Sequence, residues 1–157
     1  MSDHGTHREA QAPEDPLLSA PPTPAPLVGA WQVRGELLGE DGEGVVARMA
    51  GTGTYRWLGP SVVHELDVEV EGRRRRALEV VEPFDAALGA FATRAYDDEG
   101  RVETGTATVD AEGVWTVRDG RGVTTARLSE DGASMTSTRV RATTGVPALR
   151  LTWHRLG

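Results

Sequence analysis

The stretch SVVHELDVEV, residues 61–70, alternates between two kinds of side chain. Successive side chains of a β-strand point to opposite faces of a sheet, so residues two apart share a face. Val62, His64, Leu66, Val68 and Val70 then share a mainly apolar face, whereas the other face is acidic from Glu65 onward. This pattern is typical of an antiparallel strand with one face toward a core and the other in solvent. It predicts an extended strand whose apolar face, including the histidine, points inward.

Similar short runs recur along the chain and are separated by turns rich in glycine and aspartate. These turns are GEDGEG (39–44), EGR (71–73), DDEG (97–100), DAEG (110–113), RDGRG (118–122) and EDGA (130–133). Such residues tolerate the positive φ angles that tight hairpins need. After residue 26 we find no sustained helical spacing of apolar residues, and we count about ten strands. Because closure removes unpaired strand edges, the sequence predicts an all-β fold, a single up-and-down antiparallel β-barrel of about ten strands. A barrel of that size encloses room for side chains and one small ligand.

The composition argues against several classes of partner and site. The net charge is −7, and all 17 basic residues are arginine. We therefore expect no nucleic-acid or membrane partner, since both attract clustered positive charge. The absence of cysteine removes disulfides, thiol nucleophiles and thiolate metal sites. We predict no metal site and no other cofactor. Because the chain has no signal-like apolar segment near its start and no membrane-spanning run, we expect a cytoplasmic protein.

The first part of the chain differs in composition from the rest. It contains the proline-rich stretch APEDPLLSAPPTPAP, residues 12–26. Ordering such a segment costs conformational entropy and buries little apolar surface. We therefore expect a disordered tail over residues 1–26 and one barrel domain over residues 27–157.

The first and last predicted strands each contain a tryptophan, near a glycine in the first strand and near arginines in the last. The first strand contains LVGAW and the last contains LRLTWHRL. A Gly-x-Trp on the first strand, a β-meander and such a closing strand resemble the lipocalin-like, or calycin, barrels. In those families the first-strand tryptophan plugs one barrel end and packs against an arginine of the last strand. The resemblance implies this role for Trp31, with Arg150 or Arg155 supplying a cation–π contact and Trp153 also contributing to closure.

The likeness extends over about residues 27–156. It includes LVGAW, YRWLGPSVVHEL and VVEPFDAALGAFATRAYDDEG. Through these stretches the chain is similar to a bacterial family of uncharacterised lipocalin-like proteins. That family implies the barrel fold and no established reaction.

His64 is the first candidate site residue because it lies in the middle of an apolar strand face. A titratable imidazole there could meet a ligand or exchange a proton. The alternative is a core histidine that is hydrogen-bonded to a neighbouring strand, since buried polar groups usually find protein partners. His154 on the last strand alternates with Leu151 and Trp153, so we expect it to face solvent.

Arg76 is the second candidate, within the basic run EGRRRRALEV, residues 71–80. Pairing with the acidic face of the preceding strand explains most of the run. If Leu78 and Val80 point inward, however, Arg76 also points inward near the barrel rim. A guanidinium there needs an acidic side chain, water at the barrel mouth or an anionic ligand such as a carboxylate.

Five further residues are candidates for the lining of an interior pocket, because ligand sites combine aromatic walls with a few polar groups. They are Tyr55, Trp57, Phe91, Thr93 and Trp115. Each aromatic has the alternative of packing in the core.

These observations predict that the barrel binds a small apolar or amphiphilic ligand, with an anionic ligand as one version. We predict no catalytic residue. One alternative is an enzyme that acts on a barrel-bound substrate through His64 and an inward arginine. Others are a haem-binding barrel of the nitrobindin type, with His64 or His154 as axial ligand, and a protein-interaction module with a filled interior. The oligomeric state is left open.

Overall fold

The computed structural model describes residues 21–157, and β-strands make up most of this part. A short 3-10 helix, η1 (Ala25–Leu27), precedes the strands. The strands are β1 (Gly29–Leu38), β2 (Val45–Leu58), β3 (Ser61–Val70), β4 (Arg73–Asp85), β5 (Ala90–Asp97), β6 (Val102–Val109), β7 (Val114–Asp119), β8 (Gly122–Leu128), β9 (Ser134–Arg141) and β10 (Pro147–Arg155).

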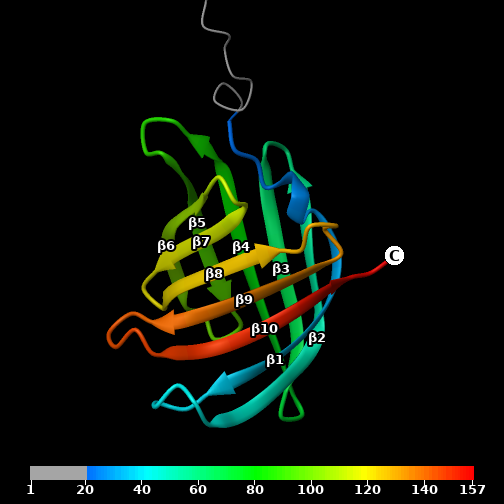
Figure 1. Ribbon diagram of the computed structural model, residues 1–157, viewed down its shortest axis with the longest axis vertical. Helices are drawn as coiled ribbons and strands as arrows, with labels where there is room; N and C mark the ends of the chain where they lie inside the picture. The colour runs from blue at the N-terminus through cyan, green and yellow to red at the C-terminus, as the bar shows by residue number, and fades with distance from the viewer. Residues whose placement is uncertain (1–20) are drawn as a thin grey trace, which may run out of the picture.

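The strands form one closed antiparallel barrel in which each strand pairs with its neighbours in sequence. Closure comes from β1, which pairs with β2 on one side and with β10 on the other. Figure 1 shows β1 and β10 side by side, from opposite ends of the chain. The predicted all-β, up-and-down barrel of about ten strands is confirmed.

The alternation of β3 is set as the sequence predicts, with Val62 and Val68 buried on the inner face. Residues directly opposite each other on antiparallel strands share a face of the sheet. His64 is opposite Tyr55 on β2 and Glu79 on β4, so all three side chains belong to the inner face. The register of two hairpins thus places a phenol, an imidazole and a carboxyl group next to one another.

The phase of β4 differs from the prediction, which placed Leu78, Val80 and Arg76 inward. Val81 is opposite the buried Val62, and Glu79 is opposite His64, so the odd-numbered positions face inward. Arg76 is exposed on the outer face. The expected inward orientation of Arg76 is therefore wrong, because the pairing with β3 overrides the apolar character of the neighbouring side chains.

One end of the barrel is closed by the segment that leads into β1. Leu27 of η1 and Trp31 belong to the buried core cluster. Trp31 donates a hydrogen bond from Nε1 to the carbonyl oxygen of Leu27, at 3.0 Å. Gly29 has φ of +140°, and a Cβ on this residue would lie 2.6 Å from an Arg155 nitrogen. Glycine at this position therefore allows the arginine of β10 to approach the segment that closes the barrel.

The predicted tail lies largely outside the described residues, which begin at residue 21. Pro24, inside the range predicted as tail, is buried and contributes to the wall of the interior cavity. The packed part of the chain thus begins before residue 27.

Candidate functional site

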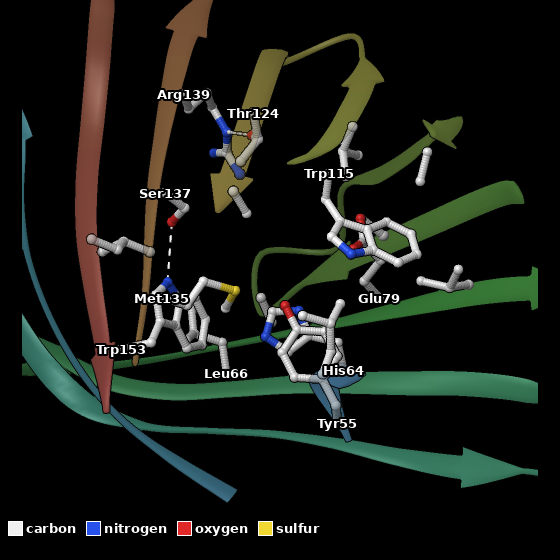
Figure 2. Close-up of a pocket in the computed structure, with 18 of the residues that line it drawn as sticks. Tyr55, His64, Leu66, Glu79, Trp115, Thr124, Met135, Ser137, Arg139 and Trp153 are labelled. Atoms are coloured by element: carbon white, nitrogen blue, oxygen red, sulfur yellow. Dashed lines mark hydrogen bonds between the residues drawn. The ribbon is translucent and has the colours of Figure 1, made fainter. Parts of the chain in front are cut away.

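A cavity of about 140 Å³ lies inside the barrel, and its walls are mostly apolar (Figure 2). Its apolar lining comes from nearly every strand and includes Val62, Leu66, Ala77, Val81, Ala95, Ala107, Trp115, Val117, Ala126, Met135, Leu149, Leu151 and Trp153. An apolar cavity of about 150 Å³ in another protein takes up benzene. The space inside this barrel therefore matches a molecule with about one aromatic ring.

Tyr55 and His64 form a stacked pair on one side of the cavity. Their ring centroids are 3.9 Å apart and their planes differ by 5°. The Trp153 ring lies at a tilt, 5.5 Å from the imidazole. Burial and, to a smaller extent, the charge of Arg121 lower the pKa of His64 to about 4. The imidazole is therefore neutral near pH 7 and has one donor and one acceptor nitrogen.

His64 has an unsatisfied ring nitrogen. Its Nε2 atom is fully buried and has no hydrogen-bond partner among residues 21–157. Leaving a buried polar atom unpaired costs about 1–3 kcal/mol, and most such atoms in proteins are satisfied. A ligand atom that bonds this nitrogen would recover part of that cost.

Glu79 brings a carboxyl group to the same inner face. Its side chain is only 17% exposed, and its closest cation is Arg121, at 3.9 Å. Burial raises the pKa of Glu79, although Arg121 acts in the opposite direction. Burial thus favours the neutral acid, which donates one hydrogen bond.

Asp119, at the end of β7, forms a close ion pair with Arg121 in the turn that follows. Arg121 donates from Nη2 to Oδ2 of Asp119 at 2.6 Å and from Nε to both carboxylate oxygens. Burial acts to raise the pKa of Asp119, but the hydrogen bonds from Arg121, together with the charges of Arg121 and Arg139, outweigh it and lower this pKa. The positive charge of Arg121 is therefore compensated by its ion pair with Asp119.

Arg139 of β9 is the second interior arginine, and its guanidinium borders the cavity next to Thr124 of β8 (Figure 2). Its Nε atom donates to Thr124 Oγ1 at 3.2 Å. No other hydrogen bond or ion pair of its guanidinium is found within the part of the chain that the structure describes. Burial, followed by the charge of Arg121, lowers the pKa of Arg139.

The structure brings together only part of the predicted site. Tyr55, His64 and Trp115 line the cavity, whereas Phe91 and Thr93 are buried outside its lining. Trp57 pairs with Val62 and so belongs to the inner face of the sheet, but it is 46% exposed near the β2–β3 turn and is not part of the cavity lining.

Of the residues predicted to close the barrel, some have that role in the structure and others do not. Arg155 lies over Trp31, and Arg150 is exposed. Trp153 instead lines the cavity and donates a hydrogen bond to Ser137. His154 is exposed, as expected from its position in the strand.

Six further polar residues at or beside the cavity wall were not predicted. They are Glu79, Arg121, Thr124, Ser137 and Arg139 in the lining, and Asp119 next to Arg121. Arg139 shares a period-two face with Met135 and Ser137, both buried, so the alternation of β9 already indicated an inward arginine.

Over residues 21–157, no group of three or more histidine, cysteine or acidic side chains is arranged to hold a metal ion. In that same range, none of the helical structure is long and apolar enough to cross a membrane.

Comparison with known proteins gives no family assignment. No family model matches the chain, and no curated protein matches it in sequence. Among solved structures, the chain is similar to a de novo designed fluorescence-activating β-barrel, at 12% sequence identity and a TM-score of 0.45. The match covers 82% of this chain and 93% of the designed one.

Proposed function

We propose that this barrel binds a small, largely apolar molecule in its interior cavity. The observation that carries the proposal is an apolar space of about 140 Å³ whose lining includes the incompletely paired side chains of His64 and Arg139. Apolar walls with a few polar groups are the usual composition of a small-molecule site. The Gly-x-Trp segment with Arg155 over Trp31 also supports a distant lipocalin-like origin for the barrel.

Two alternatives fit this interior less well. A haem is far larger than a space suited to about one aromatic ring. His64 is moreover covered by the stacked Tyr55 ring, so the residues present do not fit a haem. An interaction module with a filled interior is disfavoured by the cavity itself.

The test is a titration of the purified chain with toluene and phenol, followed by NMR of the indole N–H groups of Trp115 and Trp153. Both indoles border the cavity, so a bound ring is expected to shift their signals saturably. Ligands with so few atoms bind weakly, with Kd values of roughly millimolar or somewhat tighter.

Two leucine variants on β8 make the titration specific for the interior. Ala126 lines the cavity, and Ala126→Leu is expected to fill it and to abolish binding. Thr125 is exposed on the outer face, so Thr125→Leu is the matched control and should bind like the natural chain. Binding that survives in Ala126→Leu, or no saturable binding of either probe, would contradict the proposal.

A second candidate function is an enzyme that moves a proton on a bound substrate. It is favoured by the opposite pKa shifts of His64 and Glu79, which face the same cavity: burial keeps the imidazole neutral and raises the pKa of the carboxyl group. Cyclohexanone in D₂O tests it, because removal of an α proton and return of a deuteron from solvent replaces hydrogen without net reaction. We expect the protein to accelerate deuterium exchange of the α hydrogens. The acceleration should be lost in His64→Gln and in Glu79→Gln and kept in His154→Gln. Equal exchange rates with and without protein would reject this candidate.

A further inference from the structure

The interior polar groups are not equivalent, and their pairing indicates which kind of ligand the cavity would hold. Arg121 is engaged by Asp119 through bonds as short as 2.6 Å. Glu103 lies close to the same turn, since a Cβ on Gly120 would clash with its Oε2 atom. The acidic groups Asp119 and Glu103 therefore surround the turn that carries Arg121.

Arg139 differs because its guanidinium has an incomplete set of partners. Of its donors, only Nε has a hydrogen bond within the described residues, to Thr124. A guanidinium has five N–H donors, and a largely buried one is unfavourable without an anion or acceptors. Both terminal nitrogens of Arg139 are thus unused cationic donors at the cavity wall.

Thr124 extends this donor set. Its hydroxyl oxygen accepts the hydrogen bond from Arg139, so its own O–H proton is available as a donor. Thr124 and Arg139 both line the cavity and lie together at one side of it, across from the stacked Tyr55 and His64 rings (Figure 2). One side of the cavity therefore offers adjacent cationic and hydroxyl donors, and the other offers aromatic surface.

We propose that Arg139 and Thr124 bind the carboxylate of a one-ring aromatic acid whose ring lies against Tyr55, Trp115 and Trp153. This inference rests on the proposed function, because it needs the cavity to admit a ring. The planar guanidinium matches the geometry of a carboxylate, and a charge-assisted hydrogen bond is about twice as strong as a neutral one. The volume of about 140 Å³ limits the ring system to one ring.

The test compares three ligands of nearly the same shape and different charge, benzoate, benzamide and benzylamine, by isothermal titration near pH 7. Toluene is included to report on the cavity alone. We expect benzoate to bind at least about tenfold more tightly than benzamide, and benzylamine to bind most weakly.

Three variants assign that preference to its residues. Arg139→Gln should reduce benzoate binding to the level of benzamide, and Thr124→Val should reduce it several-fold. Arg127→Gln is the matched control, since Arg127 is exposed on the outer face of β8 and its loss changes the net charge equally. If Arg139→Gln does not fold, Thr124→Val still tests the donor pair.

The possible results separate this inference from the function on which it rests. A benzoate preference that is lost with Arg139 and kept in Arg127→Gln supports the inference. Equal binding of benzoate and benzamide, or a preference that survives in Arg139→Gln, overturns it while toluene binding still supports a ligand-binding cavity. Stronger binding of benzylamine also overturns it and assigns recognition to Glu79. No binding of any probe, toluene included, rejects both.

Discussion

Arg155 of β10 lies over the indole ring of Trp31 on β1, with its guanidinium carbon 4.2 Å from the ring centroid. The same guanidinium donates to the carbonyl oxygens of Pro26 and Val28, each at 2.7 Å, and of Gly132 at 3.0 Å. One side chain thus joins the last strand, the segment before β1 and the turn between β8 and β9. This contact ties the first strand to the last at the closed end of the barrel.

Arg155→Gln is expected to lower the free energy of unfolding by about 2–4 kcal/mol. Hydrogen bonds to charged groups contribute roughly 1.5–3 kcal/mol, and the variant also loses the cation–π contact. Urea denaturation followed by tryptophan fluorescence measures the change. Arg150→Gln is the control, because Arg150 is exposed on the same strand and should shift stability by no more than about 0.5 kcal/mol. Equal stability of the two variants would show that the contact with Trp31 is dispensable.

Ser137→Ala is expected to cost about 1–3 kcal/mol, because it leaves a buried donor unpaired. Trp153 donates from Nε1 to Ser137 Oγ at 3.1 Å, and both residues are buried. The measurement is the thermal unfolding midpoint of Ser137→Ala, compared with that of Thr136→Val at an exposed neighbouring position on β9. The difference reports the loss of the hydrogen bond from Trp153. A midpoint for Ser137→Ala as high as that of Thr136→Val would mean that water replaces the serine.

Acid is expected to destabilise the protein through His64. Because the pKa of His64 is about 4 in the folded chain and 6.5 ordinarily, the unfolded state binds the additional proton between these values. The stabilising contribution is complete above about pH 6.5 and is lost as the pH falls toward 4, by roughly 2–4 kcal/mol in total. Unfolding free energies of the natural chain and of His64→Gln, measured from pH 7.5 to 4, should therefore converge or cross as the pH falls. His154→Gln should keep the acid loss of the natural chain, and a constant difference between the natural chain and His64→Gln would contradict the assignment.

Glu79 is expected to act in the opposite direction. Burial raises its pKa above the ordinary value of 4.5, so the folded state binds more protons than the unfolded state just above that pH. Its contribution is complete below pH 4.5 and is lost as the pH rises through the folded pKa. Glu79→Gln, which stays neutral, should gain stability relative to the natural chain as the pH is raised from 4.5 to 8, and chemical denaturation at several pH values measures the gain. Glu69→Gln, at an exposed position on β3, should show no such gain. A natural chain that becomes the more stable of the two at pH 8 would refute this prediction.

The inward histidine was predictable, and its partner on β4 could have been predicted from a turn. Glu71 and Gly72 have φ of 49° and 82°, as a two-residue hairpin turn with positive φ at both positions requires. Counting outward from these two residues places Glu79 opposite His64. The apolar character of Leu78 and Val80 led to the other phase, because hydrophobicity was given more weight than hairpin register. The mistaken orientation of Arg76 follows from that choice.

Hairpin register does not predict which inward side chains of distant strands meet across the barrel. Arg139 and His64 are on strands far apart in the order β1-β10-β9-β8-β7-β6-β5-β4-β3-β2, yet both border one cavity. Which inward side chains meet depends on the tilt and stagger of the strands around the whole barrel. The size of the cavity likewise depends on how large side chains from many strands fill the interior.

The sequence by itself determined the all-β class, the closed barrel, the inward face of β3 and the importance of Trp31, because alternation and turn chemistry act between neighbouring residues. Only the tertiary structure decided that Arg155 rather than Arg150 covers Trp31, and that Trp57 is exposed and does not line the cavity. It also decided that Arg121 is engaged by Asp119 while Arg139 retains unused donors. These are contacts between strands or across a turn, and they depend on the register, twist and closure of the complete barrel rather than on any local pattern.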